Sequence, residues 1–343
     1  MRRLLNTLYV TEPDRYLSLD GENVVVLYEK TEVGRVPLHN LEAVVSFGYT
    51  GVSPALMGAC AARGVALSFL SGGGRFLARV SGETHGNVTL RRQQYRYSDD
   101  SAQSVRIARN CIAGKLCNAR WVLERAARDY PLRLDAEKLR AKSAILAQGV
   151  RNVRACADAD TLRGLEGEAA AVYFSVFDDL ILQQKEAFSF CGRSKRPPLD
   201  PVNALLSFAY TLLAHMCGAA LETAGLDPYV GFFHTDRPGR MSLALDLMEE
   251  LRCAMADRFV LTLINNRIVK RADFTYRENG AVLLSASARR SVLKHWQERK
   301  RESLTHPYLG EQLSWGMVPY IQALLLARTL REDLDAYPPF LWK

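Results

Sequence analysis

The spacing of hydrophobic and polar positions along the chain changes once, at about residue 86. Before this point, short runs rich in Val, Leu and Tyr alternate with turn-forming clusters such as Glu12-Pro13-Asp14, which predicts β-strands joined by tight turns. After it, apolar residues recur at i, i+3, i+4 and i+7, the period of amphipathic helices. The pattern predicts an α+β fold. A small N-terminal β-sheet domain should occupy residues 1–85, and a larger all-α domain should occupy residues 86–343.

Individual elements follow from the same pattern. A short helix is expected at Pro54–Arg63, with Ser53 as its N-cap and Gly64 at its end. Gly72–Gly74 should form a hairpin turn rather than a phosphate-binding loop, because no Lys-Ser or Lys-Thr pair follows. Strands are expected at Leu4–Val10, Tyr16–Leu19, Asn23–Glu29, Glu42–Phe47, Val65–Leu70 and Arg75–Val80. Longer helices are expected at Ser104–Asp129, Ala136–Gln148, Asp158–Glu186, Pro201–Ala224, Ser242–Met255, Ser285–Glu302 and Leu309–Asp335.

Composition narrows the class of protein. Of the 343 residues, 48% are hydrophobic and 24% are charged, as in ordinary globular proteins. The longest apolar runs, such as Val65–Leu70, are far shorter than the roughly 20 residues that a membrane span needs. The seven cysteines include no CxxC pair, which disfavours a zinc site or a disulfide framework. We therefore expect a cytoplasmic protein with free thiols.

Positive charge is concentrated in one segment. The chain carries a net charge of +8, and Thr89–Arg154 alone holds 15 Lys and Arg against 6 Asp and Glu. A local basic excess is typical of proteins that bind a polyanion, most often nucleic acid. The alternative is a solvated helical face without a ligand.

Three segments combine carboxylates, a histidine and turns. Glu166 lies among small residues that would let another backbone approach, His234 follows an apolar run, and Asp246, Glu249 and Glu250 share one side of a predicted helix. Taken alone, Glu166 could be solvated and His234 structural. Together, an imidazole and several carboxylates suit Mg²⁺ or Mn²⁺ better than a metal that prefers thiolates. With the basic surface, this combination indicates phosphodiester chemistry.

These segments resemble a known family. The sequence GLEG around Glu166, the segment Gly231–Glu250 and the segment Arg196–Leu213 are similar to the CRISPR-associated integrase, the metal-dependent DNA endonuclease of spacer acquisition. The order of β and α regions and their sizes fit this family over the whole chain. The ending YPPFLWK is similar to its subtype I-C branch.

The resemblance implies a set of site residues. Glu166, His234 and Glu249 would be catalytic metal ligands for Mg²⁺ or Mn²⁺, and Asp246 would be a nearby acid or an alternative third ligand. Three further positions match a family element and would either line the site or form a buried hydrogen-bonding stripe, namely Asn203, Ser207 and Tyr210. Positions expected to bind DNA are Arg106, Arg109, Arg193, Lys195, Arg196, Arg237 and Arg240. A second basic track is Arg289, Arg290, Lys294, Arg299, Lys300 and Arg301, unless it is a solvated face.

The resemblance also implies activity and partners. A DNA 3′-hydroxyl would attack a phosphodiester at the edge of a CRISPR repeat. The chain would form a homodimer through its β domain, and would join the small second CRISPR-associated protein in a heterohexamer. Two other functions fit the same ligands, a stand-alone nuclease that repairs branched DNA and a DNA-binding scaffold with a vestigial metal site. The apolar tail Tyr337–Lys343 could fold back or dock a partner.

Overall fold

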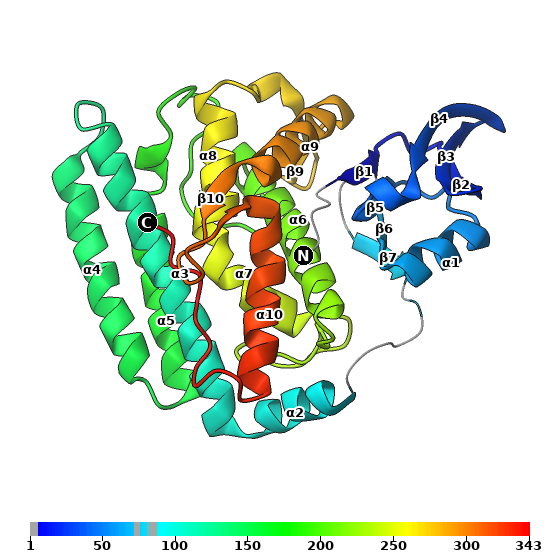
Figure 1. Ribbon diagram of the computed structural model, residues 1–343. Helices are drawn as coiled ribbons and strands as arrows, with labels where there is room; N and C mark the ends of the chain where they lie inside the picture. The colour runs from blue at the N-terminus through cyan, green and yellow to red at the C-terminus, as the bar shows by residue number, and fades with distance from the viewer. Residues whose placement is uncertain (1–5, 72–75, 81, 83–87) are drawn as a thin grey trace.

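The computed structural model describes residues 6–71, 76–80, 82 and 88–343. The strands of the N-terminal part gather with one short helix in one group, and the longer helices form a second, larger group (Figure 1). The predicted α+β class, with strands first and helices after, is confirmed. The proposed boundary between residues 85 and 86 lies outside the described residues, as does the predicted turn at Gly72–Gly74.

Two sheets make up the N-terminal part. The first has the strand order β1-β5-β6-β7, in which β1, β5 and β6 are parallel and β7 is antiparallel to β6. The second is an antiparallel meander of β2, β3 and β4. The strands are β1 (Thr7–Val10), β2 (Tyr16–Asp20), β3 (Asn23–Tyr28), β4 (Thr31–Pro37), β5 (Ala43–Phe47), β6 (Ala66–Leu70) and β7 (Phe76–Val80).

The short helix α1 (Pro54–Arg63) has its predicted ends. The side chain of Ser53 accepts a hydrogen bond from the backbone N–H of Leu56, and Gly64 takes the left-handed conformation with φ of +64°. The strand β4 was missed in the sequence analysis. Its residues are mostly exposed and include Gly34, so they show none of the apolar enrichment by which the other strands were found.

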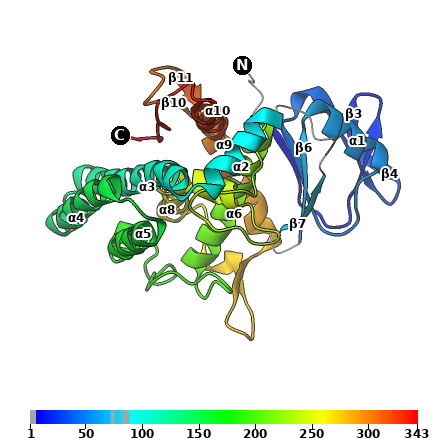
Figure 2. The same cartoon turned by 90° about the horizontal axis from the view of Figure 1, so that it is seen from below.

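The helical part surrounds one large apolar core. Figure 2 shows α3, α4 and α5 side by side at one edge, with α6 running through the middle. The helices are α2 (Val88–Asp99), α3 (Ser101–Asp129), α4 (Ala136–Ala155), α5 (Ala159–Phe174), α6 (Pro201–Thr223), α7 (Ser242–Leu251), α8 (Arg258–Asn265), α9 (Ala286–Arg301) and α10 (Val318–Leu330). Short hairpins are formed by β8 (Phe274–Tyr276) with β9 (Val282–Leu284), and by β10 (Ser303–Thr305) with β11 (Gln312–Ser314).

Four predicted helices were wrong in extent. The helix expected at Ala136–Gln148 continues to Ala155. The helix expected at Asp158–Glu186 ends at Phe174. The prediction ran too far because Phe177 and Leu180 continue the apolar spacing, although they lie in a buried turn that is not α-helical. The helix expected at Ser242–Met255 ends at Leu251, where a π-helical turn, η3 (Arg252–Asp257), begins. The helix expected at Leu309–Asp335 is only α10, whose start is marked by Pro319 in its first turn.

Helix α2 was missed altogether. Its sequence is strongly polar, and the helix ends at Asp99, directly before Asp100. The carboxylate of Asp100 accepts hydrogen bonds from the backbone N–H groups of Ala102 and Gln103, so it caps α3.

Helix α6 is long and apolar enough to cross a membrane by length and composition alone. In the fold it is a core helix, since 72% of its most apolar window is buried inside the protein. Its apolar surface is thus already covered by other helices, chiefly α7 and α10.

The C-terminal tail folds back onto the helical part. Tyr337, Phe340 and Trp342 are all buried. The carboxylate of Glu250 on α7 accepts hydrogen bonds from the Tyr337 hydroxyl and from the backbone N–H of Phe340. Asn118 on α3 donates to the carbonyl of Phe340 and accepts from the backbone N–H of Trp342. The tail is therefore an integral part of the core of this chain.

Candidate active site

Two of the three predicted ligands meet at one cation. Glu166 lies on α5 and Glu249 on α7. The ammonium of Lys115 on α3 donates to Glu166 Oε1 and lies 2.6 Å from Glu249 Oε2. The side chains of Lys115 and Glu249 are 8% and 6% exposed, whereas that of Glu166 is 23% exposed. The carboxylate pair is therefore buried on the side of α3 and α7 and open to solvent at Glu166.

Local sequence explains the position of Glu166. Asp158 caps α5 by accepting from the backbone N–H of Thr161 at 2.8 Å, and this sets the start of the helix two turns before Glu166. The expectation that another backbone approaches the small residues is not met at the two glycines beside Glu166, whereas Ala169 on the same helix is buried in the core. Gly164 and Gly167 are exposed, and a Cβ at either would meet no atom within 4 Å among the described residues.

Glu249 has a second cationic partner. Arg252, at the first position of η3, donates to both carboxylate oxygens of Glu249 at 3.0 and 3.1 Å. Burial by itself raises the pKa of Glu249. The charges of Lys115 and Arg252 outweigh it and hold that pKa well below the usual value of a glutamate. Glu249 is thus an anion that these two cations position.

His234 is oriented by Asp246. Asp246 Oδ1 lies 2.6 Å from His234 Nδ1 and also accepts from the backbone N–H of His234 at 2.9 Å. Asp246 Oδ2 accepts from the backbone N–H groups of Phe232 and Phe233 at 2.6 and 2.9 Å. A carboxylate can only accept, so Nδ1 carries the proton and Nε2 keeps its lone pair. The imidazole is therefore prepared to act as a ligand or a base through Nε2.

Only glycine fits at the start of this loop. A Cβ at Gly231 would lie 2.8 Å from Asp246 Oδ2 and 2.9 Å from two atoms of Ser242. The Gly-Phe-Phe-His loop can close on Asp246 because the backbone at Gly231 approaches without a side chain.

The donor set fits a hard divalent cation. Among the described residues, no group of three His, Cys, Asp or Glu side chains is gathered closely enough to hold a metal by itself. However, the Lys115 ammonium is a stand-in cation that contacts Glu166 and Glu249 together. The protonated form of His234 lowers the pKa of Glu249, so the imidazole is electrostatically coupled to the pair. Carboxylate oxygens with one imidazole suit Mg²⁺ or Mn²⁺.

The three expected site-lining residues have different environments. Tyr210 is buried, its hydroxyl donates to Asp257, and its ring lies 4.2 Å from the Arg252 guanidinium. Asn203 is fully buried and bonds the loop before α6 through the carbonyl of Gly192 and the side chain of Arg193. Ser207 is half-buried between them on α6. Tyr210 thus reaches Glu249 through Arg252, whereas Asn203 shapes the loop.

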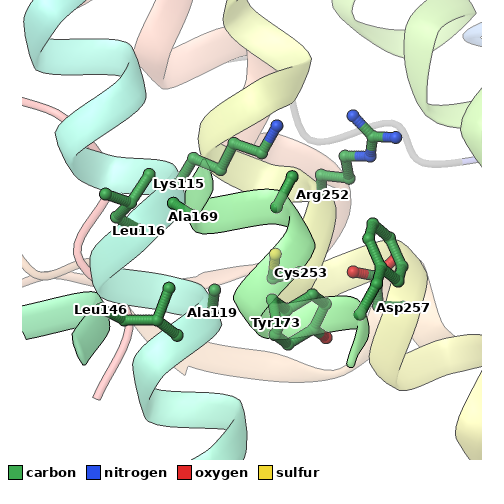
Figure 3. A pocket seen from close by; sticks show the side chains of 11 residues that line it. Lys115, Leu116, Ala119, Leu146, Ala169, Tyr173, Arg252, Cys253 and Asp257 are labelled. Carbon is green, nitrogen blue, oxygen red and sulfur yellow. The ribbon is translucent and has the colours of Figure 1, made fainter. Parts of the chain in front are cut away.

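A small cavity lies behind the carboxylate pair. Lys115 and Arg252 border one end of it, and Tyr173 and Asp257 border the other (Figure 3). The wall between them is apolar and consists of Leu116, Ala119, Leu146 and Ala169. This wall keeps the aliphatic stem of Lys115 out of water and leaves the charged end at the carboxylates.

The residues expected to bind DNA differ in availability. Lys195, Arg196 and Arg237 are exposed. Lys195 is nevertheless partly desolvated, and this, followed by the charges of Arg252 and Arg193, lowers the pKa of its ammonium, which therefore lies in the positive field of the site. Arg106 is exposed and donates to the carbonyl of Asp335 at 3.1 Å.

The remaining three make internal contacts. Arg109 donates to the carbonyl of Cys156 at 3.1 Å, and Arg240 donates to the carbonyl of Thr235. Arg193 is held by Asn203, as described above. Their guanidinium groups thus serve at least partly to fix loops near the site.

The second basic track on α9 is solvated in part, because Arg290, Lys294 and Arg301 are exposed whereas Lys300 is buried. Arg290 forms an ion pair with Glu12 at 2.9 Å, and Arg301 donates to Asn6. Lys300 is 1% exposed and donates to the Thr7 hydroxyl at 3.0 Å. These side chains bind the N-terminal strand region, so much of this track is used inside the molecule.

Two cations at the centre of the site were missed in the sequence analysis. Lys115 was counted only as part of the basic segment, and Arg252 was not singled out. Lys115 is an ionisable residue between Gly114 and Leu116 on the apolar face of a long helix. A charged residue in such a place needs a carboxylate partner, and this was the available signal.

Comparison with known proteins assigns the chain to a family. The family model described as CRISPR associated protein Cas1 matches residues 8–298. The chain therefore belongs to the CRISPR-associated Cas1 family. It is 54% identical to the CRISPR-associated endonuclease Cas1 2 of Rhodospirillum rubrum, over the whole length of both chains.

Two solved structures share the fold. A casposase bound to an integration product has a TM-score of 0.82 and 21% identity, and the similarity covers 98% of this chain and 94% of that one. A Cas6-RT-Cas1–Cas2 complex has a TM-score of 0.80 and 24% identity, and the similarity covers 98% of this chain and 36% of that one.

Proposed function

We propose that this chain is a metal-dependent DNA endonuclease and integrase that inserts new spacers into a CRISPR array. A DNA 3′-hydroxyl would attack a phosphodiester of the repeat, and the repeat strand would leave with its own 3′-hydroxyl. The observation that carries this proposal is the meeting of Glu166 and Glu249 at a single cation. The membership in a family of named endonucleases supports the same reaction class.

Glu166, His234 and Glu249 would hold Mg²⁺ or Mn²⁺. Such a cation, when bound, supplies charge stabilisation at a phosphoryl oxygen and favours deprotonation of an attacking hydroxyl. The chain's own contribution is positioning. Asp246 fixes the tautomer and direction of His234, and Arg252 fixes the carboxylate of Glu249. The predicted site residues include no Ser-His-Asp or Cys-His arrangement, so the reaction requires no covalent enzyme intermediate.

DNA would lie along the open side of the site. Lys195, Arg196 and Arg237 are exposed cations on loops close in sequence to the site elements, and Thr89–Arg154 carries a net charge of +9. Phosphate contacts of this kind position a nucleic acid without reading its sequence. Arg106 is a further candidate, whereas Arg109, Arg193 and Arg240 would act mainly through the loops that they hold.

The partners proposed are those of the family. Among the similar solved structures, one is a complex that contains Cas2, one is bound to an integration product and one is a Cas1–DNA complex, which supports Cas2 and DNA as partners of this chain. We also propose a homodimer formed through residues 1–85, a heterohexamer with Cas2 and subtype I-C membership. We also propose a cytoplasmic location, and the seven cysteines, which are unpaired in the structure, are compatible with it.

A strand-exchange assay tests the function. Wild type, Glu166→Ala and Glu168→Ala are each incubated with Mn²⁺ and a labelled branched DNA that mimics a half-integrated spacer. Glu168 is an exposed glutamate on the same helix and serves as the matched control. Wild type and Glu168→Ala should join the released 3′-end to its partner strand, and Glu166→Ala should not. Cutting without joining would favour the repair nuclease, and equal joining by all three would mean that Glu166 is not a ligand.

A further inference from the structure

The carboxylate pair has a counter-ion supplied by the chain itself. Lys115 lies in the middle of α3, has a side chain that is 8% exposed, and lines a cavity together with Leu116 and Ala119. Taking an ammonium out of water is costly unless it is paired and hydrogen bonded. Glu166 and Glu249 provide this pairing, and they do so from two other helices, α5 and α7. One flexible side chain therefore links three helices at the site.

The charges at the site already balance. Glu166 and Glu249 bring two negative charges, and Lys115 and Arg252 bring two positive charges. A divalent cation added to this arrangement would place four positive charges on two carboxylates that are largely shielded from water. Repulsion of this size is strong at low dielectric, so one of the two basic groups has to move away.

Lys115 is the group that can move. Arg252 is only three residues from Glu249, binds both of its oxygens and lies on the ring of Tyr210. Lys115 comes from a different helix and carries a flexible four-carbon stem. Its ammonium lies beside Glu166, whose side chain is 23% exposed, so a path toward solvent is open on that side.

We infer that Lys115 is the exchangeable counter-ion of the Glu166–Glu249 pair, which holds the two carboxylates together without metal and is displaced when a divalent cation binds. Lys115 is thus a positioning residue and not a ligand. This inference rests on the proposed function, because it assumes that the pair binds such a cation.

Calorimetric titration with Mn²⁺ tests the exchange. Lys115→Gln should bind Mn²⁺ about tenfold or more tightly than wild type, because no charge-assisted contact has to be broken first. In EDTA its Tm should be lower than that of wild type, and Mn²⁺ should raise its Tm by more. Lys115→Arg should bind Mn²⁺ more weakly than wild type, since a guanidinium can bind a carboxylate through two parallel hydrogen bonds and is harder to displace. This second variant keeps the positive charge, so it tests the idea even if Lys115→Gln does not fold.

Lys195→Gln is the matched control. It removes one positive charge from the same neighbourhood, and Lys195 interacts with Glu249 only through its charge. Its effect on Mn²⁺ affinity should be much smaller than that of Lys115→Gln. Weaker Mn²⁺ binding by Lys115→Gln, or an equal gain in Lys195→Gln, would overturn the exchange and leave the proposed function standing. Absence of Mn²⁺ binding in wild type would reject the metal-dependent function together with the exchange.

Discussion

Asp246 acts on the candidate site through its neighbour. Its two oxygens accept from three backbone N–H groups and from the imidazole of His234. Such a carboxylate has little capacity left for a cation. The sequence left Asp246 and Glu249 as alternative third ligands, and the hydrogen bonds favour Glu249 as the ligand and Asp246 as the residue that orients His234.

Replacing these two acids should separate their roles. Asp246→Asn keeps the size and shape of the side chain but replaces the carboxylate that accepts from the Nδ1–H of His234 by a neutral amide. The Mn²⁺ affinity should therefore fall about 10–100-fold. Glu249→Gln removes the charge of the proposed third ligand and should lower Mn²⁺ affinity further. Calorimetric titration measures both, and a larger loss in Asp246→Asn would move the third ligand to Asp246.

His215 on α6 should make stability depend on pH. Burial, and then the charge of Arg79, lower its pKa from 6.5 to about 4. In the unfolded chain His215 takes up a proton near pH 6.5, whereas in the fold it does so only near pH 4. The unfolded state therefore binds more protons between these values, and the free energy of unfolding falls as the pH drops through this window.

His215→Gln should remove part of this dependence. Urea unfolding at pH 7 and at pH 4.5 measures how much free energy of unfolding is lost between the two. This loss should be smaller in His215→Gln than in wild type by roughly 2–3 kcal/mol. His39 is exposed, and His39→Gln should behave like wild type. An unchanged drop in His215→Gln would assign the acid sensitivity to other groups.

At the scale of the element, the C-terminal tail fastens α3 to α7. Asn118 on α3 donates to the carbonyls of Glu250 and Phe340 and accepts from the backbone N–H of Trp342. Trp342 is in turn stacked by Arg125 at 4.1 Å and by Arg258 at 4.3 Å. Lys115 lies three residues before Asn118 and Glu249 directly before Glu250, so the tail stabilises the two helices that carry these site residues.

Asn118→Ala tests this fastening. The substitution leaves three buried backbone groups without their partner, and the free energy of unfolding should fall by about 2–4 kcal/mol. Asn152→Ala, on the exposed surface of α4, should change it by less than about 0.5 kcal/mol. Urea denaturation compares the two variants, and equal stability would mean that the tail adds little to the fold.

The sequence predicted elements where local signals and packing agree. The caps at Ser53 and Asp200 mark the starts of α1 and α6 correctly, because a capping side chain and a proline act within a few residues. The end of α5 and the π-helical turn after Leu251 were missed, because apolar spacing continues through both while the backbone changes. Tertiary packing decides such boundaries.

Part of the candidate site could likewise be predicted from the sequence. The resemblance of the GLEG and Gly-Phe-Phe-His segments to the family indicated Glu166 and His234, because taken alone the first could be solvated and the second structural. The ion pairs of Lys115 with two distant carboxylates join residues 51 and 134 positions apart, and no local pattern encodes such contacts. The internal use of α9 cations was missed for the same reason.

At the scale of the whole molecule, charge is distributed unevenly. The segment Thr89–Arg154 accounts for a net charge of +9 in a chain of net charge +8. Arg92, Arg96 and Arg106 are exposed members of this segment. Replacing these three by Gln should weaken DNA binding, and each lost phosphate contact should flatten the slope of log K against log salt by about 0.9.

A charge-matched control separates location from net charge. Arg267, Arg328 and Arg331 are exposed and lie outside the segment. Replacing them by Gln should leave the slope nearly as in wild type. Equal slopes in both triple variants, measured by fluorescence anisotropy across a salt series, would place the bound DNA elsewhere on the protein.

We propose above all that Glu166, His234 and Glu249 together bind a hard divalent cation, Mg²⁺ or Mn²⁺. Calorimetric Mn²⁺ titration of wild type, Glu166→Gln, Glu249→Gln and Glu168→Gln tests it most directly. We predict that each of the first two substitutions weakens Mn²⁺ binding by at least about 100-fold, the loss of a charged ligand, whereas Glu168→Gln binds as wild type does. Undiminished binding in Glu166→Gln, or an equal loss in Glu168→Gln, would contradict the account.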